Sequence, residues 1–371
     1  MQVQIARYTY IDAVRGYAIL MVIAVHALQA FGEVPPLLGR LVEQGQHGVQ
    51  LFFVASALAL CFSWTARDDG AGPFYVRRLF RIAPMFWLAI VFYLWLYGTG
   101  PRLLAPDGVG VLHVAMTATF IHGFWPDTIS SVVPGGWSVA DEVFFYALFP
   151  FLVPALLRSR WRTNLVVLAV AVVVGAQASR VLDAYSPLLF PKPAADVSHY
   201  YFFYWFPRQL PCFLLGIMLF KWARERPLPR PAVAAVLCLV SIVQMVIVPF
   251  QEGVKYALPL GPQTTYGFIF ALFVFSLMAW KSSPLVNPVA IWIGKVSYSA
   301  YFIHFAVLYY LAVPHRSGNA ALDFAIFYAI AVAITVALSS VTYWLVEQPM
   351  IRLGGRVVSR RILPPGQTAE A

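Results

Sequence analysis

Ten apolar stretches dominate the chain, and each is long enough to cross the hydrocarbon core of a membrane as an α-helix. Such a crossing needs about 20 apolar residues, and the stretches lie at 10–31, 46–66, 79–98, 138–157, 163–179, 204–221, 232–250, 263–280, 293–314 and 322–346. Of the 371 residues, 60% are hydrophobic and 11% are charged, which lies outside the range of soluble domains. The short alternating pattern of a membrane β-barrel is absent. The sequence therefore predicts an all-α polytopic membrane protein, a bundle of about ten transmembrane helices.

The distribution of basic residues predicts the orientation of this bundle. With the N-terminus in the cytoplasm, eighteen of the twenty-six Lys and Arg residues fall inside, seven fall outside and Arg15 lies within the first span, in agreement with the cytoplasmic bias of basic residues. Segment 110–124 could be an eleventh span, a re-entrant piece or an interfacial helix. A full crossing there would move the basic loops 158–162 and 221–230 outside, so we expect ten spans and both termini in the cytoplasm.

One membrane domain is expected over residues 1–350, followed by a short basic cytoplasmic tail over 351–371. The formal net charge of +10 is attributed to membrane orientation, and nucleic acid is not an expected partner. The three cysteines, Cys61, Cys212 and Cys238, lie in apolar runs without paired spacing. Neither a disulfide framework nor a metal site is predicted.

The first span carries an arginine and a histidine in an otherwise apolar stretch, RGYAILMVIAVH (15–26). Eleven residues at ~100° each bring Arg15 and His26 to within about 20° of one helix face, at depths roughly 16 Å apart. Ionisable groups inside a span usually face the bundle interior or a wet cavity, and Asp12 lies one turn from Arg15 as a partner. The alternative is that Arg15 extends to the headgroups while His26 only bonds a neighbouring helix.

The fourth span opens with PGGWSVADEVFFYALFP (134–150). Ser138 followed by Asp141 has the spacing of a capping box, which assigns Asp141 to the positive N-terminus of the helix. Glu142 would lie in the first turn, near the depth that His26 reaches in the first span. We therefore expect the Glu142 carboxylate to meet the His26 imidazole.

Other ionisable residues stand at the ends of the remaining spans. Arg77, Arg78 and Arg81 precede the third span, where guanidinium groups suit phosphates, although a positive-inside anchor explains them equally well. At the end of the last span Glu347 is expected to be structural and to pair with Arg352 or another inward arginine.

Taken in order, these motifs resemble the membrane acyltransferase 3 family. YIDAVRGYAILMVIAVHA resembles its opening helix, GVQLFFVASALAL its second helix and RRLFRIAPMFW its R-x-x-R loop. PGGWSVADEVFFYALFP resembles its tryptophan, serine and glutamate segment, and GKVSYSAYFIHFAVL with VTYWLVEQP its last two helices. The resemblance implies a bacterial inner-membrane enzyme that moves an acyl group, usually acetyl, from cytoplasmic acyl-coenzyme A to a hydroxyl of a surface or exported glycan.

Carried over by position, the resemblance implies that His26 is the catalytic histidine, that Arg15 is the channel arginine and that Glu142 is the acidic partner. It further implies that Arg78 and Arg81 bind the acyl donor together with Arg15. Residues expected at the substrate are Arg208 at the outer end of the sixth span, His304 within the ninth, and Trp137. The chain departs from the family pattern in its second helix, where Gln50 replaces a common acidic residue and Ala57 a common glycine.

These expectations combine into a hypothesis for the reaction. Coenzyme A phosphates would rest on Arg78 and Arg81, its extended arm would pass Arg15, and His26 would deprotonate the acceptor hydroxyl for attack on the thioester; a transient acyl-histidine stays open. Expected partners are the acyl-coenzyme A, a carbohydrate or glycan acceptor, membrane lipid and glycan-assembly proteins. The alternative from a different class is a transporter or flippase that uses Arg15, His26 and Glu142 as a proton relay.

Overall fold

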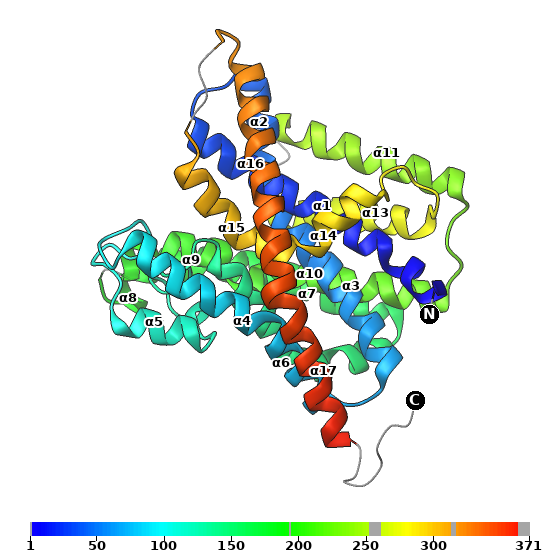
Figure 1. The fold of residues 1–371 in the computed structure, drawn as a ribbon. Coiled ribbons are helices and arrows are strands. Elements are labelled where there is room, and N and C mark those ends of the chain that lie inside the picture. The colour runs from blue at the N-terminus through cyan, green and yellow to red at the C-terminus, as the bar shows by residue number, and fades with distance from the viewer. Residues whose placement is uncertain (1, 193, 252–260, 313–316, 363–371) are drawn as a thin grey trace.

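The structure, a computed structural model, describes residues 2–192, 194–251, 261–312 and 317–362. Within these ranges the regular structure consists of helices, and no strand is present (Figure 1). The N-terminal end of α1 (Gln2–Phe31) and the connection between α10 (Phe206–Glu225) and α11 (Pro231–Ile247) lie on the right in Figure 1. The short helices α5 (Val111–Ala118), α8 (Ser186–Leu189) and α9 (Ser198–Tyr204) lie on the left. These two sets of segments therefore lie on opposite sides of the bundle.

Eight helices in the described ranges are long and apolar enough to span a membrane, and a bent pair makes a ninth such unit. The helices of the eight are α1 (Gln2–Phe31), α3 (Gly48–Arg67), which continues α2 (Pro36–Glu43) through a 3₁₀ turn (Gln44–His47), α4 (Ala71–Tyr97), α6 (Gly136–Arg158), α7 (Trp161–Ala184), α11 (Pro231–Ile247), α13 (Gly261–Ala279) and α16 (Ala320–Thr342). An all-α polytopic membrane protein is thereby confirmed. The expected sixth span corresponds to α10 (Phe206–Glu225), which is not one of these units because Arg208, Gln209 and Lys221 lower its hydropathy.

The expected ninth span is a broken helix. α14 (Pro288–Lys295) and α15 (Ser297–Tyr310) meet at an angle of 79°. The apolar run 293–314 therefore does not form one straight helix, and its last residues, from 313 on, lie outside the described residues.

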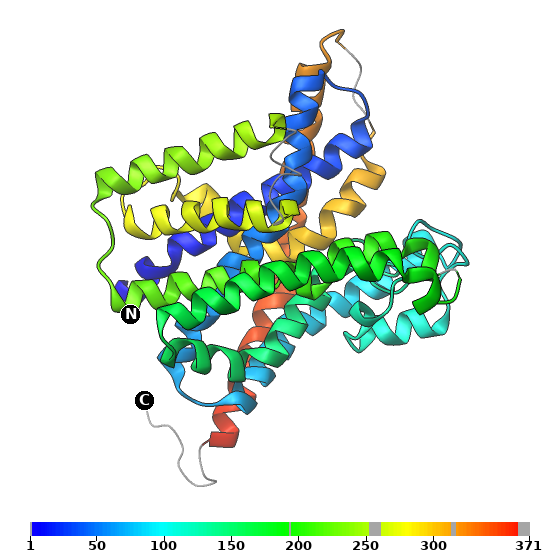
Figure 2. The ribbon, with the colours of Figure 1, turned by 180° about the vertical axis from the view of Figure 1, so that it is seen from behind.

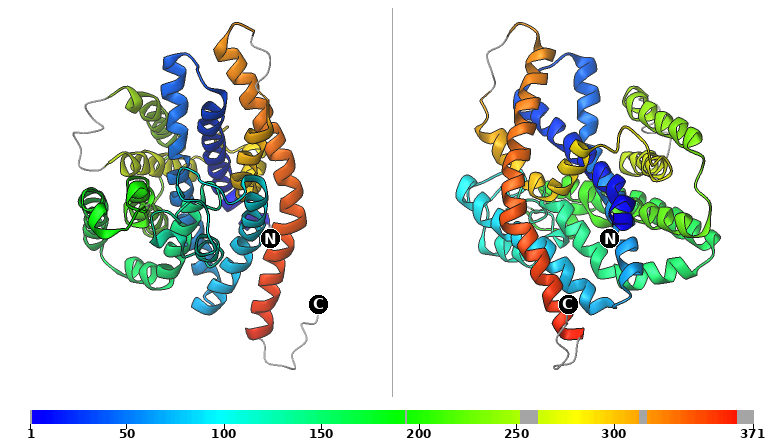
Figure 3. Two further views of the ribbon diagram at one scale, coloured as in Figure 1. Left: turned by 90° about the vertical axis from the view of Figure 1, so that its left-hand side faces the viewer. Right: turned by 45° about the vertical axis from the view of Figure 1, so that its right-hand side comes forward.

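The last helix is longer than expected. α16 continues through a π-helical turn (Tyr343–Glu347) into α17 (Gln348–Ile362), and the run Ala320–Ser359 forms one unit of 40 residues along the outside of the bundle (Figure 3). The expected tail 351–371 is therefore helical as far as Ile362. Its remaining residues lie outside the described residues.

Segment 110–124 does not cross the membrane. Its helix α5 (Val111–Ala118) has 8 residues, about 12 Å at 1.5 Å per residue, against a hydrocarbon core of about 30 Å. A 3₁₀ turn (His122–Phe124) follows. Burial lowers the pKa of His122 to about 4, so the imidazole is neutral and its Nε2–H donates to the carbonyl of Gly136 at 3.0 Å. The segment thus holds the start of α6. The other short elements are α8 (Ser186–Leu189), α9 (Ser198–Tyr204) and the 3₁₀ turns Ala194–Val197 and Val248–Phe250.

Two glycines allow α1 and α14 to touch through their backbones. A Cβ on Gly294 would lie 1.7 Å from the carbonyl oxygen of Asp12, and one on Gly16 would lie 2.2 Å from that of Ala290. Small residues permit such close approach between membrane helices. Because Gly16 follows Arg15 and Gly294 precedes the break at Val296, this contact places Arg15 beside the start of α15.

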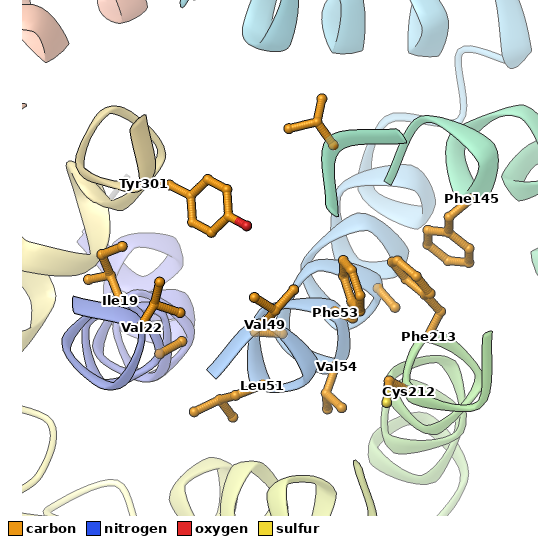
Figure 4. Packing of buried hydrophobic residues seen from close by; sticks show 14 of the residues in the cluster. Ile19, Val22, Val49, Leu51, Phe53, Val54, Phe145, Cys212, Phe213 and Tyr301 are labelled. Atoms are coloured by element: carbon orange, nitrogen blue, oxygen red, sulfur yellow. The ribbon is translucent and has the colours of Figure 1, made fainter. Parts of the chain in front are cut away.

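Aromatic side chains fill the centre of the bundle. Phe213 of α10 stacks between Phe53 of α3 and Phe145 of α6, with ring centroids 4.5 and 4.2 Å apart. α7 and α10 run side by side (Figure 2). Figure 4 shows the three rings next to one another, while Tyr301 of α15 points toward Val49 of α3. The aromatic stack closes one side of the interior and leaves the space between Val49 and Tyr301 for the site.

Replacing Gly294 with alanine is expected to destabilise the protein. The new methyl group would meet the backbone of α1, and forcing extra volume into a packed contact costs roughly 1–3 kcal/mol. The melting temperature of the purified protein in detergent measures this effect. Gly72→Ala is the matched control, because Gly72 is helical and a Cβ there meets no atom within 4 Å. An unchanged melting temperature for Gly294→Ala would show that the two helices are not in backbone contact.

Candidate functional site

The interior contains a large pocket at the end of α1 that carries His26. This His26 pocket has a volume of about 700 Å³ and is lined by residues that include His26, Gln29, Gln50, Trp137 and Tyr301. They come from α1, α3, α6 and α15. Segments far apart in the sequence therefore converge on one cavity, as is common for small-molecule sites.

A second, narrower cavity lies deeper in the bundle. This Glu142 pocket has a volume of about 70 Å³ and is lined by residues that include Arg15, Ser56, Arg81, Glu142 and Tyr146. Val49 and Tyr301 line both the Glu142 pocket and the His26 pocket, so the two cavities adjoin at these side chains. A third cavity of about 190 Å³, lined by Asp12, Arg15 and Arg67 among others, shares Arg15 with the Glu142 pocket.

The three cavities form a series along α1. Arg15 lines the Glu142 pocket and His26 lines the His26 pocket, at two different depths along α1, as expected for residues on one helix face. The middle cavity, the Glu142 pocket, is the smallest of the three. It has room for only a few water molecules, because each needs about 10–15 Å³ of cavity volume. An extended substrate arm would need Val49 and Tyr301 to move apart.

His26 is oriented by a glutamine on its own helix. Its Nδ1–H donates to Oε1 of Gln29 at 2.8 Å, which leaves the lone pair on Nε2 for proton transfer. The expected hydrogen bond to Glu142 is wrong: among the described residues, Gln29 is the only hydrogen-bond partner of the His26 side chain. The expectation compared the depths of His26 and Glu142 in their two spans. Depth alone does not show that the two side chains face different cavities. Sequence reasoning missed Gln29; its spacing of three residues from His26 on one helix is the signal that could have identified it.

His304 packs against His26 instead of lining the pocket. The two imidazole centroids lie 5.3 Å apart, and the His304 ring has no exposed surface. Its Nδ1–H donates to the carbonyl of Ala300 at 2.9 Å, and within the described residues its Nε2 has no hydrogen-bond partner. Phe305 also lies against His26, at 4.5 Å between centroids. The position of His304 fits a role in holding the His26 ring better than direct contact with a substrate.

Glu142 is bound by two hydroxyl groups. Ser56 and Tyr146 both donate to its Oε1 at 2.6 Å. Arg15, Arg78 and Arg81 all lie within electrostatic range of this carboxylate. The structure thus brings Glu142 together with the predicted arginines.

The expected capping box at the start of α6 is wrong. Gly135 occupies the N-cap position without a side-chain hydrogen bond. The single hydroxyl proton of Ser138 is instead shared between the Tyr301 hydroxyl oxygen at 2.9 Å and the Gly135 carbonyl at 3.1 Å. Asp141 is buried, and within the described residues its Oδ2 has no partner. The glycine pair at 135–136 lets the chain turn into the helix without a side-chain cap.

The three arginines that open α4 differ in their partners. Arg77 is neutralised by Asp69, with bonds of 2.5 and 2.7 Å from its two terminal nitrogens, and these hydrogen bonds lower the pKa of the Asp69 carboxyl. In the described part of the chain, neither Arg78 nor Arg81 makes an ion pair within 4.0 Å. Arg78 lies against the rings of Phe74 and Tyr146. Arg78 and Arg81 are therefore the cations available for an anionic ligand.

The predicted substrate residues Trp137 and Arg208 occupy different places. Trp137 lines the His26 pocket and stacks on Tyr204 with a centroid distance of 4.6 Å. Arg208 is not part of that lining. Its Nε–H donates to Oε1 of Gln263 at 3.0 Å, and its guanidinium lies over the ring of Phe203. Phe203 lines the His26 pocket, so Arg208 contacts a residue of the pocket wall and not the pocket itself.

Glu347 caps the broken helix. Its Oε1 accepts from the Ser299 backbone N–H at 3.0 Å and also from the Ser299 hydroxyl, in the first turn of α15, where a carboxylate is favoured. The structural role is as expected. Of the arginines considered as its partner, Arg352 donates to Gln348 at 2.6 Å, whereas Arg81, another inward arginine, lies within electrostatic range of Glu347.

Comparison with known proteins identifies the family. The acyltransferase domain family matches residues 8–344, and the chain belongs to this family. Proteins from Staphylococcus aureus strains COL and N315, provisionally named O-acetyltransferases, are 24% identical over 388 residues that cover 95% of this chain. The chain spans 58% of the length of those relatives. The acyltransferase MdmB of Streptomyces mycarofaciens is 26% identical over 409 residues, covering 100% of this chain and 98% of MdmB. No solved structure matches.

Metal ligands do not gather in the described residues. No group of three or more His, Cys, Asp or Glu side chains there could hold a metal ion.

Removing the Glu347 carboxylate is expected to loosen α15. With Glu347→Ala, the Ser299 amide and hydroxyl would lose their buried acceptor, at a cost of about 1–3 kcal/mol. Glu347→Gln keeps one acceptor oxygen and should lose less. The melting temperatures of the two variants in detergent measure the difference. If both variants melt with the wild-type protein, the cap contributes nothing to stability.

Proposed function

We propose that this protein is a membrane O-acyltransferase that moves an acyl group, most simply acetyl, from acyl-coenzyme A to a hydroxyl group of a carbohydrate. The single observation that carries this proposal is the series of adjoining cavities, with Arg15 and Arg81 around Glu142 at one depth and His26 at the other. Family membership supports the transfer chemistry and favours it over the transporter alternative.

The donor would bind at the arginine end. Arg78 and Arg81 lack ion-pair partners within the described residues, and guanidinium groups bind phosphates through paired hydrogen bonds. Arg15, which lines both inner cavities, would contact the arm of the donor as it extends toward His26. On the charge pattern, this end faces the cytoplasm of a bacterial cell.

The acceptor would bind at the His26 end. Nε2 of His26 takes the proton of the acceptor hydroxyl, and the oxygen attacks the thioester carbonyl carbon. The carbon–sulfur bond then breaks, and the coenzyme A thiolate leaves and receives the proton from the imidazolium. Gln29 holds the ring in the tautomer that this step needs, since a base must present a free lone pair to the proton that it removes.

In this scheme Glu142 organises the arginines and does not orient His26, which was the role expected from its depth in the fourth span. Its negative charge lies among Arg15, Arg78 and Arg81, and the hydrogen bonds from Ser56 and Tyr146 hold the carboxylate in place. It would set the spacing of the arginines, which otherwise repel one another. Loss of Glu142 would then weaken donor binding and leave the orientation of His26 intact.

His26→Ala protein is expected to lose acyl transfer. General-base catalysis contributes typically 10²–10⁴-fold, so product formation from radiolabelled acetyl-coenzyme A and a sugar acceptor should fall by about that factor. Release of free thiol, followed with a thiol reagent, measures the same reaction from the donor side.

A folded control makes this experiment decisive. Gln244→Ala changes an exposed residue of α11 and should leave transfer unchanged. Equal turnover in His26→Ala and wild-type protein would remove His26 from the chemistry, and the absence of thiol release from the wild-type protein would contradict the donor.

Arg78→Ala and Arg81→Ala are expected to raise the KM for acetyl-coenzyme A by roughly 10-fold or more, because each removes a charge-assisted contact to phosphate worth about 1.5–3 kcal/mol. Arg77→Ala is the matched control. Its guanidinium is occupied by Asp69, so the donor KM should stay unchanged. The KM for dephospho-coenzyme A thioesters gives a further comparison.

The reverse ranking would contradict the assignment. A larger effect of Arg77→Ala, or equal effects of all three substitutions on donor and acceptor KM, would mean that the arginines serve membrane orientation.

A further inference from the structure

Gln50 offers an unused hydrogen-bond acceptor beside His26. Its side chain is 3% exposed and belongs to the lining of the His26 pocket. Its Nε2–H donates to Oε1 of Gln209 at 2.8 Å, and Gln209 in turn donates to the carbonyl of Phe203 at 3.3 Å. Because the nitrogen is occupied, the amide orientation is fixed. Within the described residues its Oε1 has no hydrogen-bond partner.

A buried acceptor without a donor is rare and unfavourable in native proteins. A ligand that supplies a hydroxyl at this point would satisfy it. Trp137, stacked on Tyr204, lies in the same lining and offers a flat apolar surface of the kind that polar ligands use for orientation. The combination suits a ligand with a ring and several hydroxyl groups.

The charged side chains of the pocket provide no net positive charge for an acidic ligand group. Its arginine is Arg102, whose terminal nitrogens donate to the carbonyls of Ser131 and Gly98 at 3.1 and 2.5 Å. Its guanidinium also lies against the ring of Tyr97. Glu43 adds a negative charge to the same lining. Among the described residues of the lining, the charges of Arg102 and Glu43 cancel, so a carboxylate on the ligand would be desolvated there without a net positive charge to offset the cost.

We infer that the His26 pocket selects an uncharged sugar as the acceptor, and that Gln50 Oε1 accepts a hydrogen bond from a sugar hydroxyl other than the one that is acylated. This inference rests on the proposed function. Gln50 is then a specificity-determining residue. Gln209 is a positioning residue that keeps the Gln50 oxygen turned toward the ligand.

The test compares wild-type and Gln50→Met protein with acetyl-coenzyme A and the para-nitrophenyl glycosides of glucose, galactose, mannose and rhamnose, together with the matched glucuronide. We expect transfer to at least one neutral glycoside and none to the glucuronide. Gln50→Met should raise the acceptor KM roughly 10-fold, while the donor KM and the kcat stay within twofold. Gln244→Met, on the exposed face of α11, is the control and should leave both KM values unchanged.

Deoxy glycosides identify the bond itself. Removal of one particular hydroxyl should raise the KM of wild-type protein about as much as Gln50→Met does, and should have no further effect in that variant. An unchanged acceptor KM in Gln50→Met, transfer to the glucuronide, or transfer to none of the neutral glycosides while thiol is still released overturns the inference. Absence of thiol release from wild-type protein contradicts the proposed function instead.

Discussion

The backbone contact between α1 and α14 links the helix that carries Arg15 and His26 to the helix pair that carries Tyr301 and His304. Gly16 and Gly294 bring the two helices so close that a methyl group at either position would overlap with the other backbone. α1 carries Arg15 and His26, and the helix that follows α14 carries Tyr301 and His304. Because α14 is pressed against α1, the chain must turn sharply before α15, by 79°. That turn directs α15 across the upper part of α1, where its aromatic and imidazole side chains surround His26.

The interior is divided electrostatically along the same direction. Around Glu142 the structure gathers guanidinium groups, hydroxyls and one carboxylate, an environment for an anionic ligand. Around His26 it gathers amides and aromatic rings, and the arginine of that pocket is bound to backbone carbonyls. Val49 and Tyr301 stand between the two environments. A charged donor and an uncharged acceptor would therefore be held at opposite ends, and the narrow middle cavity would limit leakage of water and protons between them.

Local sequence pattern was sufficient to predict the architecture and the relative positions of the candidate residues on α1. Apolar length predicted the polytopic bundle, and helical geometry placed Arg15 and His26 along one interior path. The same reasoning failed where contacts between helices determine the positions of side chains and the course of the chain. The sequence pattern places Glu142 at about the depth of His26. In the structure the Glu142 carboxylate instead accepts hydrogen bonds from Ser56 and Tyr146. The break at Val296 was hidden within an apolar run. It lies next to a contact between Gly16 and Gly294, 278 residues apart in the chain (294 − 16), and hydropathy carries no information on such contacts.

The partner of His26 has a chemical consequence for the proposed reaction. In a histidine dyad with a carboxylate, the negative charge stabilises the imidazolium that forms after proton transfer. The Gln29 amide oxygen orients the ring in the same way but carries no formal charge, and the ring lies against Phe305 and the buried His304. An imidazolium in these surroundings is poorly stabilised. The proton taken from the acceptor must therefore pass on quickly, and the departing thiolate is the group that can receive it, which couples deprotonation of the alcohol to cleavage of the thioester.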